Sequence, residues 1–141
     1  MDLFQFLLAS DICDNWGRSP GATIEEVTHL SEGCRFALPS DYLNFLLFSN
    51  GTDAPLPILP YGCNLFSAEE VLEANQDYEL EKYLPGYFAI GTSGGGELLV
   101  FDYSAIPWRV CSVPAIGLSE ANVLVVAQSF LDLLHLIGRD E

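Results

Sequence analysis

The chain has 141 residues, half of them hydrophobic, which fits one compact domain because a chain of roughly 150 residues buries about 70% of its unfolded surface. No apolar run reaches the roughly 18 residues that a membrane-spanning helix needs, so we expect a soluble protein. Twenty acidic residues against five basic ones give a formal net charge of −15. This charge repels nucleic acid and anionic membranes and argues against both as partners.

We do not expect this protein to be exported. Its first residues include a short apolar run, but Asp2 stands where a secretory signal has Lys or Arg. We therefore expect a cytoplasmic protein. The cysteines favour reduced, buried thiols over a zinc site or a disulfide framework, because they are far apart and form no CxxC pair: Cys13, Cys34, Cys63 and Cys111.

The first well-marked helix is predicted over residues 24–32. Thr23 is its expected N-cap, and Glu26 stands at the third helical position, as in a capping box. Apolar residues recur at spacings of three, which predicts a stripe that faces the core: Ile24, Val27 and Leu30.

A second helix is predicted within Leu38–Gly51, which reads LPSDYLNFLLFSNG. Pro39 is expected at its first helical position, where the missing N–H would have no partner, and Asn50-Gly51 takes the positive φ that ends a helix. Apolar residues lie on nearly every side of this helix. It is therefore expected to be central or covered by other elements.

Prolines and a capping box mark the next two elements. Residues 52–64 contain three prolines, which predict a loop with at most a short edge strand near Ile58-Leu59. Ser67 and Glu70 then form a capping box, and Phe66 and Val71 stand where a hydrophobic staple would lie. This helix is predicted to run to about Lys82.

The second half of the chain favours strands. Tyr87–Ile90 and Leu98–Tyr103 are rich in strand formers and are joined by GTSGGG, which predicts an antiparallel hairpin. Trp108–Val113 suits a third strand, whereas Val123–Val126 is β-branched and ambiguous. Ser129 is expected to cap a last helix that stops at Gly138.

This order of elements predicts an α+β protein, a mostly antiparallel sheet with helices packed on one side, as a single domain over residues 1–141.

Several of these segments together resemble a known family. The motifs are the Leu-Pro-x-x-Tyr-x-x-Phe-Leu helix ending in Asn-Gly, Leu65-Phe66-Ser67 before an acidic helix, Gly86-Tyr87-Phe88-Ala89-Ile90-Gly91 running into Gly94-Gly95-Gly96, and Ala127-Gln128-Ser129-Phe130. In this order they resemble the SUKH superfamily, which includes the yeast cell-wall synthesis regulators and many bacterial immunity proteins. The resemblance implies the same α+β architecture and a protein that binds a secreted toxin, often a nuclease, without chemistry of its own.

One enzyme pattern competes with this interpretation. Gly91-Thr92-Ser93-Gly94-Gly95 matches the G-x-S-x-G of hydrolase nucleophile elbows, and Asp102 or Asp132 followed by His135 gives the chain order of a catalytic triad. The elbow, however, needs a strand followed by a helix, and a strand is predicted here after the glycines. A phosphate cradle is disfavoured because no Lys-Ser/Thr follows them. A glycine-rich hairpin loop is the favoured interpretation.

Negative charge is concentrated on the predicted helix 67–82. Acidic residues at spacings of three and four form like-charge pairs that each cost roughly 0.2–0.5 kcal/mol. The stripe is either a solvated face or a surface that meets Arg and Lys of a partner. Its members are Glu69, Glu70, Glu73, Asp77 and Glu81.

The leading hypothesis is a non-enzymatic immunity protein that neutralises a cognate, basic, nuclease-type toxin through an acidic surface. No cofactor or metal is expected, since His29 and His135 lack ligand partners at suitable spacing. Trp16 or Tyr61 is a candidate aromatic anchor. The alternative is a regulatory or scaffolding module like the yeast cell-wall members, and the oligomeric state is left open. Candidate partner-binding residues are the five of the stripe together with Glu97 and Asp102.

Overall fold

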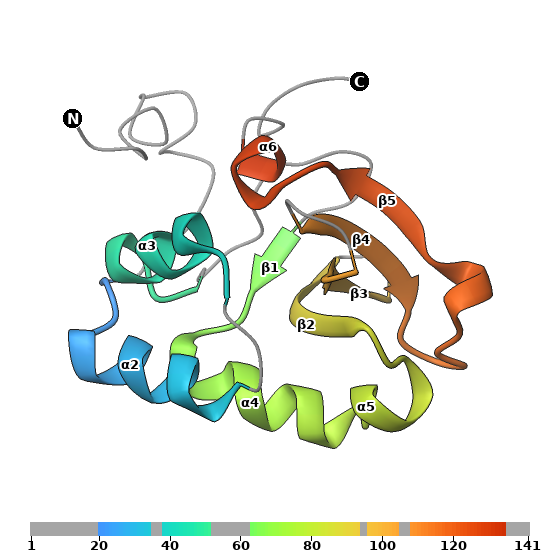
Figure 1. The fold of residues 1–141 in the computed structure, drawn as a ribbon, viewed down its shortest axis with the longest axis horizontal. Coiled ribbons are helices and arrows are strands. Elements are labelled where there is room, and N and C mark those ends of the chain that lie inside the picture. Colours follow the sequence, from blue (N-terminus) through green and yellow to red (C-terminus); the bar gives the residue numbers. More distant parts are fainter. Residues whose placement is uncertain (1–19, 35–37, 52–62, 94–95, 105–107, 135–141) are drawn as a thin grey trace.

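The protein folds around one antiparallel sheet in which every strand pairs with the next strand along the chain. The computed structural model describes residues 20–34, 38–51, 63–93, 96–104 and 108–134. The strand order is β1-β2-β3-β4-β5, and helices pack around this meander (Figure 1). The predicted α+β class with a mostly antiparallel sheet is confirmed.

The last four strands follow the predicted order, whereas the strand at Cys63–Leu65 was not predicted and begins within the predicted loop over residues 52–64. The predicted hairpin is β2 with β3, the predicted third strand is β4, and the ambiguous segment near residue 125 is a strand. The strands are β1 (Cys63–Leu65), β2 (Tyr87–Ser93), β3 (Glu97–Asp102), β4 (Arg109–Pro114) and β5 (Leu124–Ala127). The helices are α2 (Ile24–Gly33), α3 (Ser40–Phe48), α4 (Ala68–Asp77), α5 (Leu80–Tyr83) and α6 (Phe130–Leu134), with a 3-10 turn, η2, at Glu120–Asn122.

Helix α2 begins at the predicted capping box. The Thr23 N–H donates to Glu26 Oε1 at 2.9 Å, and the Glu26 N–H donates to Thr23 Oγ1 at 3.1 Å. The expected core-facing stripe is wrong at its first member, because Ile24 is 66% exposed whereas Leu30 is fully buried. Steps of three residues in a helix of 3.6 residues per turn rotate the stripe, so that Ile24 and Leu30 lie about 120° apart around the axis.

Helix α3 lies at the centre of the core, as its apolar sequence predicted. Pro39 was expected at the first helical position but is the N-cap, so the helix begins one residue later, at Ser40. Tyr42 is fully buried, and its ring meets those of Phe101 on β3 and Phe130 on α6, each with a centroid distance of 5.3 Å. Gly51 follows the helix with a φ of 81°, a conformation in which an L side chain is strained.

The predicted helix over residues 67–82 is interrupted. Helix α4 ends at Asp77, Glu79 takes a left-handed φ of 54°, and α5 begins at Leu80. The interruption brings Leu80 and Leu84 into a second core cluster, where both are buried. Burying two leucines stabilises the fold by roughly 1.5–3 kcal/mol each. This gain exceeds the roughly 1–2 kcal/mol that one left-handed residue costs.

The break also explains how both faces of the sheet are covered. Leu99 and Phe101 of β3 face the main cluster, which includes α3, α6 and the buried side of α2 and α4. Their neighbours Leu98 and Val100 face the second cluster, which α5 closes together with Leu118 and Val123. Strand β3 is therefore apolar from Leu98 to Phe101, between Glu97 and Asp102 at its two ends, as strands buried on both faces are.

Some predicted features fall outside the described residues. These are the N-terminal apolar run, Trp16, the strand near Ile58-Leu59, Tyr61, His135 and the stop at Gly138.

Candidate functional site

Helices α2 and α4 lie side by side and begin at the same end of the molecule (Figure 1). Asn50, just after α3, links their starts. Its N–H donates to the Pro20 carbonyl at 3.1 Å, and its Oδ1 accepts from the Ala68 N–H at 2.6 Å. Its Nδ2 donates to Glu69 Oε1 at 2.7 Å. At the other end, Gly33 lies against Leu72, since a Cβ on Gly33 would come within 2.5 Å of Leu72 Cδ1.

Exposed carboxylates cover both of these helices. In their first turns the acidic groups are favoured by the positive end of the helix dipole, but neither helix has a basic residue in its last turn, where the dipole favours a cation. Glu32 and Asp77 lie there instead. We call the two helices with their exposed acidic groups the acidic helix pair: Glu25, Glu32, Glu69, Glu70, Glu73 and Asp77.

The structure separates the predicted site residues into several environments. On α4, Glu69 bonds to Asn50, and Glu70 Oε1 accepts from the Ser67 N–H at 3.1 Å within the capping box. Glu73 and Asp77 are exposed on the same helix. Beyond the break, Glu81 lies on α5. Glu97 is outside this surface, because it opens β3 and pairs with Pro114 of β4.

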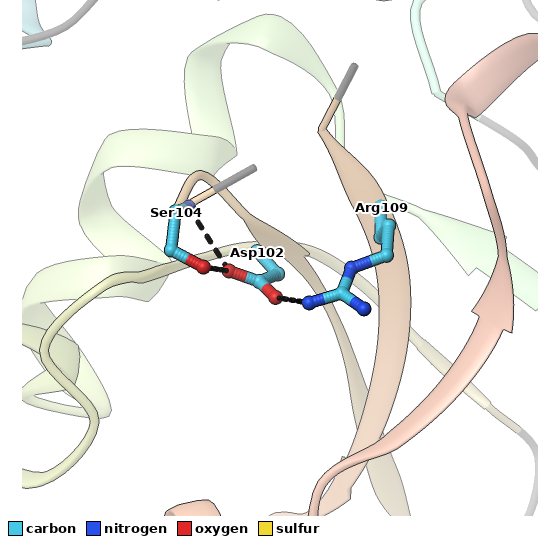
Figure 2. Close-up of polar contacts among 3 residues, drawn as sticks. All are labelled: Asp102, Ser104 and Arg109. Atoms are coloured by element: carbon cyan, nitrogen blue, oxygen red, sulfur yellow. Dashed lines mark hydrogen bonds and ion pairs between the residues drawn. The ribbon is translucent and has the colours of Figure 1, made fainter. Parts of the chain in front are cut away.

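Asp102 was expected on an exposed acidic surface, and this expectation is wrong. Its side chain is only 5% exposed, and Oδ2 accepts from Arg109 Nη2 at 2.6 Å (Figure 2). Oδ1 accepts from the Ser104 N–H at 3.0 Å and from Ser104 Oγ at 2.5 Å. Burial alone raises the pKa of Asp102, but the bonds from Ser104 and Arg109 outweigh it, and the pKa lies below its ordinary value. Asp102 therefore holds the end of the β3–β4 ladder together.

The described part of the chain offers no lysine or arginine without an acidic partner. It contains Lys82 and Arg109, and each is paired with a carboxylate: Lys82 Nζ is 3.9 Å from Glu79 Oε2, and Arg109 is bound to Asp102. The negative field of the acidic helix pair is therefore not balanced by cations within the same described surface.

A cleft of about 490 Å³ adjoins the C-terminal ends of the acidic helix pair. This α4–α5 cleft lies within the range of volumes typical of binding pockets. Burial raises the pKa of its Cys34 thiol to about 11, so that the thiol is protonated and unreactive at neutral pH. Its other lining residues come from α2, α4, α5 and the adjoining ends of β2 and β3: Gly33, Leu72, Asn75, Gln76, Glu79, Leu80, Glu81, Lys82, Tyr87, Phe88 and Tyr103.

The G-x-S-x-G sequence lies where a hairpin connects two strands. Gly91 to Ser93 end β2, and β3 begins at Glu97. Gly91 has a packing role, because a Cβ there would come within 2.2 Å of the Asn64 carbonyl oxygen on β1. Residues 94–95 and His135 lie outside the described residues. Among the residues that the structure describes, no three His, Cys, Asp or Glu side chains are grouped to hold a metal ion.

These features agree with a comparison against protein families. The profile of the SMI1 / KNR4 family (SUKH-1) matches residues 21–135. The chain belongs to this family. Membership in the SMI1 / KNR4 family is consistent with an immunity or a regulatory module that works through protein–protein interaction. No protein with curated annotation matches the chain. Over the described ranges, every helix is too short or too polar to cross a membrane.

Two features of the acidic helix pair were not predicted from the sequence: the position of α2 beside α4 and the side-chain contacts of Asn50. The capping box of α2 placed Glu25 and Glu26 in a first turn, but the sequence alone did not place α2 beside α4. Asn50 was interpreted only as a helix stop, although its side chain also bonds to α4. The one local signal was Gly33 at the end of α2, where the absence of a side chain admits Leu72 of α4.

Proposed function

We propose that this SUKH-1 protein is a non-enzymatic, cytoplasmic immunity protein that binds and neutralises a cognate toxin through the acidic helix pair. The observation that carries the proposal is the packing of two acidic helices side by side, with each described lysine and arginine already paired with a carboxylate. Family membership supports a module that works by protein–protein contact.

The charge pattern supports a basic partner. On α4, Glu73 is four residues from both Glu69 and Asp77, and such like-charge pairs each cost roughly 0.2–0.5 kcal/mol. Glu32 and Asp77 also oppose the dipoles of their helices. A stable helix would be better served by lysine at these positions, so their acidity favours a role in recognition.

A nuclease-type toxin fits this surface because a nuclease is basic where it holds phosphates. Carboxylates spread over two neighbouring helices present negative charge to that basic surface and compete with the nucleic acid. Complementary fields raise association rates towards about 10⁸ M⁻¹s⁻¹ at low salt. The same fields are screened beyond about 8 Å at physiological ionic strength, so the rate should fall as salt is added.

The test uses the full chain and the product of the gene adjacent to its own, co-purified and then measured for association rate across a salt series. The test variant is Glu73→Gln with Asp77→Asn, because these side chains are exposed and take no part in the capping box or the Asn50 contacts. The matched control is Glu97→Gln with Asp132→Asn, which removes the same charges from β3 and α6, away from α2 and α4 (Figure 1).

We expect the test variant to associate roughly two- to tenfold more slowly at low salt, and the control to stay close to the parent chain. A complex whose association rate is insensitive to salt, or equal losses in both variants, would contradict the proposed surface. Covalent labelling of Ser93 by a serine-reactive probe would contradict a non-enzymatic role. Binding to a host cell-wall regulator rather than to a toxin would favour the regulatory alternative.

A further inference from the structure

The α4–α5 cleft combines an apolar interior with a polar rim. Leu72, Leu80 and Phe88 supply apolar side chains, and Phe88 and Leu80 are at least nine-tenths buried. Tyr87 and Tyr103 add aromatic rings from the ends of β2 and β3. Aromatic and aliphatic walls of this kind accept the hydrocarbon stem of a long side chain.

Hydrogen bonds within the protein hold the wall of the cleft that α4 and β2 form. Asn75 Nδ2 donates to the carbonyls of Val71 and Ala89, both at 2.9 Å, and its Oδ1 accepts from the Ala89 N–H at 2.8 Å. The Asn75 amide is thus engaged within the fold. Gln76 and Glu79, which are exposed, are the polar groups on this side that face solvent.

The field at the cleft is negative for reasons that go beyond its side chains. Helix α2 ends at Gly33, beside the cleft, and α4 ends at Asp77, one residue after Gln76 in its lining. The C-terminal end of a helix carries about half a negative charge. Glu79 and Glu81 line the cleft and outnumber the one cation there, Lys82, so both helix dipoles and the net charge of the lining act in the same direction.

The protein itself shows how a cation is accommodated at this rim. Lys82 Nζ lies 3.9 Å from Glu79 Oε2 and 5.0 Å from the centre of the Tyr83 ring. A carboxylate and an aromatic face together form a good environment for a basic group. Lys82 is 65% exposed in this pair, so it is loosely held and can be displaced.

We propose that the α4–α5 cleft receives an arginine side chain of the basic protein partner, an inference that rests on the proposed function. Arginine suits it better than lysine, because a guanidinium is weakly hydrated and stacks on aromatic rings such as those of Tyr87 and Tyr103. Glu79 supplies the countercharge. Burial, followed by the charges of Asp102 and Glu120, raises the pKa of Tyr87 above its ordinary value.

The proposal predicts opposite effects from two adjacent charges. Glu79→Gln removes the countercharge and should weaken arginine binding, whereas Lys82→Ala removes a competing cation and should strengthen it. The matched control is Asp132→Asn, which removes one negative charge from an exposed position on α6, outside the cleft and outside the acidic helix pair. A purely diffuse attraction to the charge of −15 would affect Glu79→Gln and Asp132→Asn alike.

The experiment titrates acetyl-Gly-Arg-Gly-amide into the isotope-labelled full chain and follows backbone amide shifts by NMR, with acetyl-Gly-norleucine-Gly-amide as the neutral probe. We expect saturable shifts confined to residues that line the cleft, with a dissociation constant on the order of 1–10 mM. Glu79→Gln should weaken binding about threefold, Lys82→Ala should tighten it by a similar factor, and Asp132→Asn should leave it unchanged.

Shifts spread over the acidic helix pair, equal binding of the norleucine peptide, or equal effects of Glu79→Gln and Asp132→Asn would overturn the proposal. These results would leave the toxin-binding proposal standing, since that proposal is judged by the salt dependence and by the Glu73 and Asp77 variant. Conversely, an arginine-specific cleft in a chain that binds no adjacent gene product would support the cleft and contradict the proposed function.

Discussion

Asn75 on α4 holds the backbone of Ala89 on β2 with both ends of its amide. Its Nδ2 donates to the Ala89 carbonyl at 2.9 Å, and its Oδ1 accepts from the Ala89 N–H at 2.8 Å. Strand β1 pairs with β2 only as far as Leu65 opposite Gly91. Beyond it, the Phe66 N–H donates to the Ile90 carbonyl. The Asn75 side chain therefore replaces the missing strand beside Ala89 and fixes α4 to the sheet.

Replacing this amide should destabilise the fold. Asn75→Ala leaves the N–H and the carbonyl of the fully buried Ala89 without these partners. Each such group costs roughly 1–3 kcal/mol, so we expect the free energy of unfolding to fall by at least about 2 kcal/mol. Urea denaturation followed by circular dichroism measures the change. Gln76→Ala on the same helix is the control, and an equal loss there would contradict the role given to Asn75.

Gly91 should tolerate no side chain. In Gly91→Ala the new Cβ would come within 2.2 Å of the Asn64 carbonyl oxygen, a backbone atom that cannot rotate away. We expect a loss of roughly 1–3 kcal/mol in the free energy of unfolding, with faster amide hydrogen exchange in β1 and β2. Gly86→Ala is unsuitable as a control because Gly86 has a positive φ. Thr92→Ala, next to Gly91 on β2, is the control. Unchanged exchange in Gly91→Ala would refute the close approach.

Because of the buried Asp102 carboxylate, the free energy of unfolding should decrease at acidic pH. The folded pKa of Asp102 is lower than its unfolded pKa, because the hydrogen bonds from Ser104 and Arg109 outweigh the effect of burial. Its contribution is therefore complete above about pH 4 and is lost as the pH falls through the folded pKa. Asp102→Asn should lower the free energy of unfolding by roughly 1–3 kcal/mol at pH 7. The difference between variant and parent should shrink towards pH 2, and a difference that is constant with pH would contradict this assignment.

Removing the hydroxyl of Tyr42, unlike the substitutions above, should not destabilise the fold. This hydroxyl is buried, and the structure gives it no hydrogen-bond partner among the described residues. Tyr42→Phe removes this unsatisfied group and keeps the ring contacts, so we expect the free energy of unfolding to stay the same or to rise by about 1 kcal/mol. Phe45→Leu, which alters a ring of the same cluster, is expected to destabilise. A clear loss of stability in Tyr42→Phe would reveal a partner for the hydroxyl.

The same residue gives a second test at alkaline pH. Burial, helped by the nearby Cys34, raises the pKa of Tyr42 far above its usual range. A raised folded pKa contributes stability that is complete below the unfolded pKa near 10 and is lost as the pH rises above it. The parent chain should therefore lose stability above about pH 10 more steeply than Tyr42→Phe does. Equal alkaline slopes would contradict the assignment.

Local signals predicted where elements begin better than where they end. The capping boxes at Thr23 and Ser67 marked both helix starts correctly, because a cap is formed by residues three positions apart. The break at Glu79 carried no glycine or proline to announce it. It arises because Leu80 and Leu84 reach a cluster formed by distant strands. A sequence read locally does not contain that distance information.

The candidate site was also predicted correctly where local spacing decides it and incorrectly where long-range packing does. The acidic residues of α4 were found from their spacing, which one helix fixes. Asp102 was misplaced because its burial depends on Arg109, seven residues further along the hairpin. Helix α2 was missed as a neighbour of α4, because Asn50 and the Gly33–Leu72 contact determine that packing across long stretches of chain.

The contact between Tyr42 and Phe130 also bears on when the protein becomes functional in the cell. The two rings are 88 positions apart in the chain yet 5.3 Å apart in the core. During translation the early helices leave the ribosome long before Phe130 does. Until Phe130 emerges, the core around Tyr42 lacks one of its aromatic rings. The aromatic core is therefore complete only in finished copies of the chain and not in nascent ones.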